Sequence, residues 1–440
     1  MNINIVDRNL ESKRWFIAIA AIVIQLCLGT VYSWSVFKND LVANQGWDEV
    51  ATSATFMICI GIIGIAAAFG GILVDKKGPK LVATIGGILF GLGTIIGGVG
   101  IQMQNIIILY LGYGVLGGLG NGFGYVTPIA TLIRWFPDKR GLVTGLAVMG
   151  FGAGAFFMGL IAPANIITWG VPNTLYIWGA IFLILVVLAA QLFENPPSGW
   201  QPANFTPKSE LATSHAESYG FSEATKSPQW WMLWAMLFLN VTAGIGLISQ
   251  LSPLARDLCP AIGQSNLSPE EMLIAVDAAG GFVVAIASIF NGLGRLFWAW
   301  ISDAIGRKTV FSIMFLSQAV LYLIIPEINS YYLFAVVACY LLACYGGGFA
   351  TMPAFAADAF GSKNIGRIYG TMLTAWGAAG VVGPFIFAWM KQATGTCNLA
   401  LYVASGLLLV GFILSRAYKR PLRKHDRDQI DRHRSEKVPH

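Results

Sequence analysis

The chain consists of long apolar stretches separated by short polar connections. Each stretch is close to or above the roughly 20 residues that an α-helix needs to cross a bilayer. The twelve stretches fall near residues 15–37, 50–74, 81–102, 106–133, 141–163, 173–193, 228–254, 272–301, 309–326, 331–357, 368–390 and 398–415. We therefore predict an all-α membrane protein with twelve transmembrane helices.

One long polar stretch divides these helices into six and six. It contains Asn195-Pro196-Pro197-Ser198-Gly199, followed by Ser, Thr, Glu and Lys without an apolar period, which is typical of a linker. The predicted domains are an N-terminal six-helix bundle, a cytoplasmic linker loop, a C-terminal six-helix bundle and a basic cytoplasmic tail. Their ranges are 1–193, 194–226, 227–416 and 417–440.

The two halves repeat each other in sequence. The stretch Gly71–Lys80 after the second helix is echoed by Ala299–Lys308 after the eighth helix. Two further motifs recur at nearly the same offset, 225 to 228 residues. They are Phe123–Pro128, which returns as Phe349–Ala354, and Gly141–Gly145, which returns as Gly366–Gly370. Three matches at one offset indicate two pseudo-symmetric bundles.

Composition excludes a soluble domain and charge sets the orientation. Hydrophobic residues make up 56% of the 440 residues and charged residues only 11%. Of the 28 Lys and Arg residues, 24 lie in the two termini, the linker and the connections on one side, and three lie on the other side. The positive-inside rule therefore predicts that both termini are cytoplasmic. The net charge of +6 is carried largely by the tail, where it suits anionic lipid rather than nucleic acid.

No constellation of residues predicts catalysis, a metal site or a cofactor. There is no nucleophile and base pair and no nucleotide loop, and the six cysteines include no C-x-x-C. Cys259 and Cys397 both fall in outer connections, so the sequence permits a disulfide between them but does not predict one.

Arg295 is a cation inside a membrane helix. It follows the uncharged stretch 280–290 and lies eight residues before Asp303, which begins a polar turn. The helical rise places it roughly 12 Å from that turn, close to the middle of the membrane. A guanidinium at this depth predicts a substrate or ion pathway. The alternative is an Arg held by interior carbonyls or by one buried carboxylate.

The parallel repeat, with an acid, a glycine and basic residues in its cytoplasmic turns, resembles the major facilitator superfamily. This resemblance implies a substrate cavity between the halves and transport by rocking one half against the other. Asp75 and Asp303, with Arg140 and Arg367, are then the expected cytoplasmic gate. The alternative is that the two acids are ordinary caps and topology signals.

Three blocks look like the oxalate/formate antiporter family, which is related to the monocarboxylate transporters. They are Gln25–Phe37, Arg134–Gly141 and the Asn291-Gly292 pair followed by Arg295. The resemblance implies that Arg295 binds the substrate carboxylate. Members that carry oxalate use a second cation, a Lys in the eleventh helix, whereas this chain has no Lys between Arg367 and Lys391.

One buried positive charge suits a small monocarboxylate better than a dicarboxylate. A guanidinium offers a planar fork of donors and stays charged when it loses water. The other predicted substrate-binding residues are aromatic or amide side chains, although helix packing explains each aromatic residue equally well. They are Tyr345, Phe349 and Trp376 in the second half, and Tyr32, Asn121, Phe123 and Tyr125 in the first.

A single residue is the candidate for coupling transport to the movement of a proton. All four His residues lie in polar segments, so an intramembrane imidazole relay is excluded. Asp277 lies on the same helix face as Arg295 but roughly 27 Å away, too far to pair with it. It is the candidate to take up a proton in the outward cavity, the alternative being an exposed acid at a helix end.

These observations predict a monomeric secondary transporter of the cell (inner or plasma) membrane. Its expected partners are the bilayer, a proton and a small monocarboxylate such as L-lactate or pyruvate. The alternatives are a carboxylate exchanger of the oxalate:formate type and, on weaker grounds, a drug efflux carrier, since cationic drug pumps usually carry buried acids.

Overall fold

The computed structural model describes residues 5–202, 218–259 and 268–421. The middle of the predicted linker, 203–217, and most of the predicted basic tail, 422–440, lie outside the described residues. In the described part the secondary structure is helical throughout.

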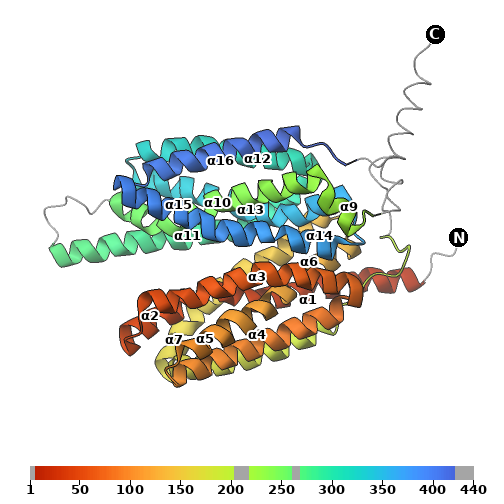
Figure 1. Ribbon diagram of the computed structural model, residues 1–440, viewed down its shortest axis with the longest axis horizontal. Helices are drawn as coiled ribbons and strands as arrows, with labels where there is room; N and C mark the ends of the chain where they lie inside the picture. Colours follow the sequence, from red (N-terminus) through yellow and green to blue (C-terminus); the bar gives the residue numbers. More distant parts are fainter. Residues whose placement is uncertain (1–4, 203–217, 260–267, 422–440) are drawn as a thin grey trace, which may run out of the picture.

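The first group of helices precedes the linker and the second group follows it (Figure 1). The first group contains α1 (Ile5–Gly29), the 3₁₀ turn η1 (Thr30–Ser33), α2 (Trp34–Gln45), α3 (Glu49–Lys77), α4 (Pro79–Gln102), α5 (Ile106–Leu109), the π-helical turn η2 (Tyr110–Leu116), α6 (Gly117–Trp135) and α7 (Arg140–Ala190). The second contains α9 (Phe221–Lys226), α10 (Pro228–Asp257), α11 (Pro269–Ile305), α12 (Arg307–Ile324), η4 (Ile325–Glu327), α13 (Tyr331–Phe360), α14 (Ile365–Met372), α15 (Thr374–Thr394) and α16 (Asn398–Ala417).

Caps begin several of these helices. The Asp48 carboxylate accepts a hydrogen bond from Ala51 N at 2.7 Å, which starts α3. Ser268 and Glu271 form a capping box at the start of α11, and Ser330 caps α13. Each cap satisfies backbone N–H groups that have no partner within the helix.

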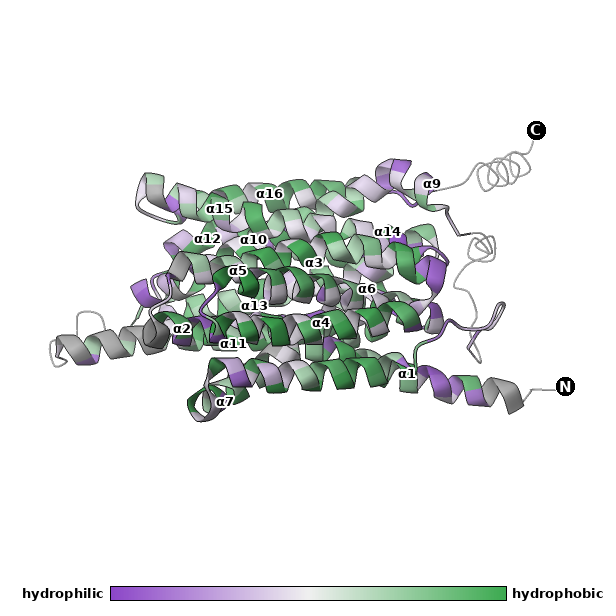
Figure 2. Cartoon of the chain, turned by 60° about the horizontal axis from the view of Figure 1, so that its bottom comes forward, coloured by the Kyte–Doolittle hydropathy of each residue, from purple (hydrophilic) through white to green (hydrophobic). Residues whose placement is uncertain are grey.

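Twelve helices in the described part are long and apolar enough to cross a membrane, as predicted. Their apolar residues run along most of their length, and polar residues gather at the helix ends (Figure 2). Two of the spans lie within α7, which bends at Gly170, where φ is +75°. A side chain would be strained at this φ, so glycine makes the bend possible.

Three of the described spans are interrupted along their length. The first span passes from α1 through the 3₁₀ turn η1 into α2, and the fourth contains the π-helical turn η2. The eleventh span is broken at Leu373, between α14 and α15. Irregular turns of this kind release backbone groups and often mark functional positions.

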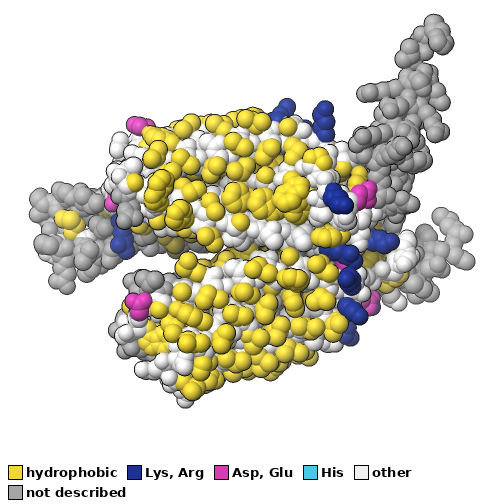
Figure 3. All heavy atoms as spheres, viewed as in Figure 1, with side chains coloured by type: hydrophobic (Ala, Val, Ile, Leu, Met, Phe, Trp, Pro, Cys, Tyr) yellow, Lys and Arg dark blue, Asp and Glu magenta, His cyan; other side chains and the backbone are white. Residues whose placement is uncertain are grey.

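The two bundles meet most closely at one end, which we call the basic end. The start of α1 and the end of α16 lie there, and Lys and Arg side chains gather there on the visible face (Figures 1 and 3). At the opposite end Figure 3 shows a gap between the bundles.

Glycines form the contact between the bundles. α3 packs on α14 and α15, and α7 packs on α11. A Cβ atom on Gly71 would overlap the carbonyl oxygen of Gly366, and one on Gly141 would overlap that of Ala299. Further along, the contact loosens: a Cβ on Gly152 would lie 3.8 Å from Gly292 Cα. The bundles therefore touch backbone to backbone near the basic end and diverge away from it.

Candidate functional site

Arg295 lies on α11 and is buried between the two bundles, with 3% of its surface exposed. Its Nη1 donates to the carbonyl oxygen of Val148 on α7 at 3.1 Å, so the side chain reaches the opposite bundle. Its Nε donates to Asn291 Oδ1 at 3.4 Å. The guanidinium also lies over the ring of Phe349, with its carbon 5.7 Å from the ring centre.

In the described part of the chain, no acid neutralises this charge. Among the described side chains no carboxylate comes within 4.0 Å of Arg295, and its polar contacts are one carbonyl and one amide. Taking an ion out of water is costly unless an opposite charge accompanies it. The arrangement is therefore suited to receiving an anion.

Aromatic rings from both bundles surround the guanidinium. Phe151 of α7 makes edge contacts with Tyr32 of η1 and Tyr125 of α6, with ring centres 5.3 and 5.2 Å apart. Phe349 of α13 lies 5.9 Å from Tyr125 and 5.8 Å from Trp376 of α15. This continuous aromatic group, which we call the aromatic cluster, joins the two bundles around Arg295.

Several buried polar groups lie around Arg295. Tyr32, Tyr125, Tyr345 and Tyr369 all lie close enough to Arg295 to interact with its charge. The buried hydroxyls of Tyr125 and Tyr369 interact with each other, and the buried indole Nε1 of Trp376 lies beside Tyr345. None of these three groups makes a hydrogen bond of regular geometry to a described residue, so each can also bond to a ligand or water.

The predicted substrate-binding residues therefore do not all lie beside Arg295. The structure brings Tyr32, Tyr125, Phe349 and Trp376 together in the aromatic cluster, and Tyr345 within electrostatic reach of Arg295.

Asn121 and Phe123 have other neighbours. Asn121 Nδ2 donates to the carbonyl oxygen of Leu28 at 2.9 Å, which joins α6 to α1, and its Oδ1 is buried without a partner. The side chain of Phe123 lies against Gly70 of α3. The side chain of Asp277 lies outside the described residues.

Sequence reasoning missed Phe151 and Tyr369. Phe151 stands among the glycines of the fifth span, a setting that indicates helix packing rather than a site. Tyr369 lies on α14, close to the polar turn that precedes the eleventh span. Only the packing of α14 against α6 brings it beside Tyr125.

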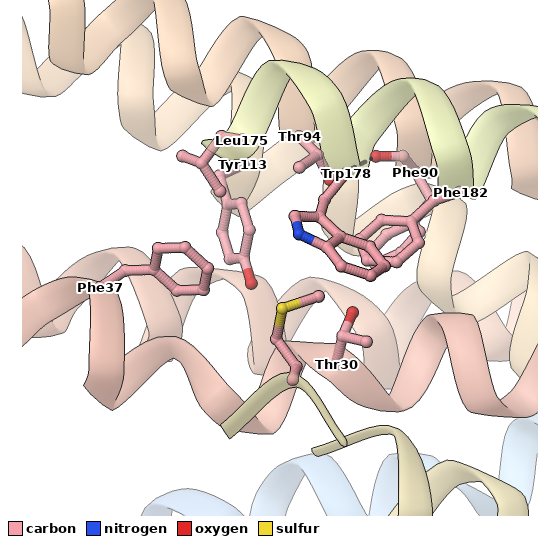
Figure 4. A pocket seen from close by; sticks show the side chains of 9 residues that line it. Thr30, Phe37, Phe90, Thr94, Tyr113, Leu175, Trp178 and Phe182 are labelled. Carbon is pink, nitrogen blue, oxygen red and sulfur yellow. Dashed lines mark hydrogen bonds between the residues drawn. The ribbon is translucent and has the colours of Figure 1, made fainter. Parts of the chain in front are cut away.

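A separate small cavity lies inside the first bundle (Figure 4). It has about 10 Å³ of space for the centre of a water-sized molecule, enough for roughly one water. Its walls come from the first, third, fourth, fifth and sixth spans: Thr30, Phe37, Phe90, Thr94, Tyr113, Met158, Leu175, Trp178 and Phe182. None of these residues belongs to the aromatic cluster, so this cavity is distinct from the candidate site.

Two ionic clusters join the bundles at the basic end. In the first, the Asp75 carboxylate of α3 accepts from the backbone N–H groups of Gly366 and Arg367, at 3.2 and 2.8 Å. It also forms an ion pair with Arg134 and lies 3.6 Å from Arg367 Nε. Its side chain is only 1% exposed.

The second cluster repeats this pattern with the bundles exchanged. Asp303 of α11 accepts from the backbone N–H groups of Gly141 and Leu142, both at 3.0 Å, and pairs with Arg307. Asp358 of α13 adds a link, because it pairs with both Arg140 of the first bundle, at 2.6 Å, and Arg307, at 3.0 Å. Sequence reasoning missed Asp358 and Arg134.

The two outer cysteines are not bonded to each other. Both thiols are free and buried. Cys259 Sγ contacts the carbonyl oxygen of Ala275 and Cys397 Sγ contacts Gln250 Oε1, at 3.8 and 3.9 Å.

Comparison with known proteins is consistent with this architecture. The sequence profile of the Major Facilitator Superfamily matches residues 15–276 and 260–438. The chain therefore belongs to the major facilitator superfamily.

Individual relatives show which members of the superfamily the chain resembles. The oxalate:formate antiporter of Oxalobacter formigenes is 30% identical over 410 residues, which cover 92% of this chain and 91% of the relative. Monocarboxylate transporter 14 of Mus musculus is 22% identical over 457 residues, covering 91% and 88%. Within the superfamily the chain thus resembles the oxalate/formate antiporter family and the monocarboxylate transporters.

A solved structure of the transporter FucP in the outward conformation superposes with a TM-score of 0.66 at 16% identity, covering 92% of this chain and 100% of that one. At this identity the match supports the fold alone.

Proposed function

We propose that this protein is a secondary transporter that moves a small monocarboxylate anion, such as L-lactate or pyruvate, together with a proton by alternating access. The observation that carries the proposal is the unneutralised Arg295 guanidinium between the bundles. An anion bound there supplies the missing charge, and a carboxylate fits the planar fork of a guanidinium.

The surroundings of Arg295 favour one carboxylate and a short carbon tail. The eleventh span, Ile365–Lys391, has Arg367 at one end and Lys391 at the other and no cation between them. A second carboxylate would therefore remain unneutralised. Phe151, Phe349 and Trp376 provide apolar ring surface for the tail, and Trp376 Nε1, which lies beside Tyr345, provides a donor for a further oxygen.

The ionic clusters act in the proposal as the cytoplasmic gate, with the basic end on the cytoplasmic side. Asp75 with the backbone of Gly366 and Arg367, Asp303 with the backbone of Gly141 and Leu142, and Asp358 with Arg140 hold the bundles together while the opposite end is open. Opening toward the cytoplasm then requires both clusters to separate.

Asp277 is the proposed proton acceptor, because it stands two residues before the membrane-spanning part of α11, on the outer side. If it couples transport, uptake at acidic external pH falls in Asp277→Asn. Unchanged pH-dependent uptake in that variant would exclude this role.

A second candidate function is exchange of two carboxylates. It is favoured by the 30% identity with the oxalate:formate antiporter over 92% of this chain. Counterflow separates the two candidates, because an obligate exchanger requires substrate on both sides whereas a symporter runs into empty vesicles.

The test is uptake of labelled lactate, pyruvate, formate and oxalate by purified protein in liposomes at two external pH values. Arg295→Gln removes the charge at similar size and is expected to abolish carboxylate uptake. Lys80→Gln, the same loss of charge at an exposed position, is the matched control and should leave uptake unchanged. Full uptake by a folded Arg295→Gln variant would refute the proposal.

A further inference from the structure

The connection between the bundles touches the gate from both of its described ends. Asn195 lies five residues after the end of α7, and its Oδ1 accepts a hydrogen bond from Arg134 Nη1 at 2.7 Å. At the other end Ser218 Oγ accepts from the backbone N–H of Lys363 at 3.2 Å. Neither contact belongs to the Asp75 or Asp303 carboxylate.

Besides Asn195, Arg134 has three other hydrogen-bond partners. Nη2 pairs with Asp75 and also donates to the carbonyl oxygen of Lys363 at 3.1 Å. Nε donates to the carbonyl oxygen of Ser362 at 3.2 Å. Ser362 and Lys363 lie in the turn between α13 and α14 of the opposite bundle, so Arg134 bridges the bundles, and its planar fork must keep one orientation to reach them all.

Asn195 is held in place locally. The neighbouring carbonyl of Glu194 accepts from the indole Nε1 of Trp135 at 2.8 Å, and the ring of Trp135 packs on Trp200 with 5.0 Å between ring centres. Pro196 follows Asn195 and restricts its backbone to extended conformations. The amide therefore approaches Arg134 from a fixed direction.

The turn 362–363, whose carbonyl oxygens accept from Arg134, is held in place by residues at the other end of the connection. Gly361 has φ +82° and lies so close to Ser218 that a Cβ atom would lie 2.5 Å from its Oγ. Asn364 Nδ2 donates to the carbonyl oxygen of Tyr219 at 2.7 Å, and Tyr219 N donates to that of Phe360 at 2.9 Å. Residues at both ends of the connection thus hold the two surfaces that meet in the gate.

We propose that Asn195 is a positioning residue of the gate, which orients Arg134 toward Asp75 and the 362–363 turn and so favours the state closed at the basic end. Ser218 has the matching role on the opposite bundle. The inference rests on the alternating-access part of the proposed function and not on the identity of the substrate.

The test measures the conformation without any substrate. Spin labels are placed on cysteines at Lys77 and Thr309, exposed at the basic ends of the two bundles, in a chain whose six native cysteines are replaced by alanine. A second pair at Met103 and Thr396 reports on the opposite end. Pulsed electron spin resonance then gives the ratio of closed to open basic ends.

Asn195→Ala and Ser218→Ala are each expected to lower this ratio about three- to tenfold, as for the loss of one ordinary hydrogen bond. Asn195→Asp keeps an acceptor toward Arg134 and is expected to restore the ratio. Asn173→Ala, which removes an exposed amide that donates to the carbonyl oxygen of Trp169 at the opposite end, is the matched control.

The measurement is repeated with Asp303→Asn, which weakens the other cluster and brings the two states closer in population. Ratios that stay at the control value in both backgrounds would overturn the inference. Failure of the substrate proposal would instead appear as absent carboxylate uptake with these distance shifts intact.

Discussion

Replacing Asp75 by Asn tests whether the first ionic cluster holds the basic end closed. The carboxylate accepts two backbone N–H groups of the opposite bundle, from Gly366 and Arg367, and pairs with Arg134. An asparagine has one acceptor oxygen, so its NH2 group must face either the backbone N–H groups or the guanidinium. At least one hydrogen bond to a charged group is therefore lost.

Such a bond contributes about 1.5–3 kcal/mol to stability. Because the backbone donors belong to the opposite bundle, the loss falls on the closed state and not on the open one. The ratio of closed to open basic ends is then expected to fall about 10- to 150-fold. Distances between spin labels at Lys77 and Thr309 measure this ratio directly.

The matched control is Asp48→Asn, the same substitution at the other end of α3. Asp48 caps that helix by accepting from Ala51 N at 2.7 Å, and asparagine caps equally well, so the ratio should not change. If Asp75→Asn leaves both the distances and the transport rate at the control values, Asp75 is an ordinary cap and the gating argument fails.

Three further predictions follow from the packing. Gly141→Val is expected to favour the open basic end strongly, since even a Cβ atom would overlap Ala299 O, and spin-label distances that match the wild type would contradict this. Trp376→Phe keeps the ring beside Phe349 but removes the indole N–H, which lies beside Tyr345. The apparent affinity for the carboxylate should fall about tenfold at unchanged thermal stability, and an unchanged KM would show that the indole does not bind substrate. Gln318→Leu leaves Asn240 Oδ1 without its donor and should destabilise the protein by about 1–3 kcal/mol, seen as a lower unfolding temperature, whereas Gln191→Leu at an exposed site should not.

A residue of the site could be predicted from the sequence only where its charge differs from that of the apolar residues around it. Arg295 stands out because a cation in an uncharged span is costly anywhere except beside a cavity or partner. Phe151 and Tyr369 carry no such signal, since aromatic residues are common in packed helices. Their place beside Tyr125 depends on how α7 and α14 pack on α6, which no local pattern encodes.

The residues of the gate also divide into those that the sequence reveals and those that only the structure reveals. The acids at the ends of the second and eighth spans are visible as repeated motifs in the sequence. Arg134, the partner of Asp75, lies 59 residues further along the chain. Asp358 pairs with Arg307 of its own bundle and with Arg140, 218 residues away, where the bundles meet. The extra pair that Asp358 makes with Arg140 has no carboxylate equivalent in the first half, where the repeat places Leu132 and Ile133.

Length and polarity of each segment determined the number of spans, and the repeat determined the division into two bundles, because each depends on residues close together in the chain and on the thickness of the membrane. The tertiary structure decided which glycines allow the bundles to touch, which end is closed, and which hydroxyl and indole groups lie around Arg295. These features depend on contacts between helices that are distant in sequence, so they require the shapes of both contacting surfaces.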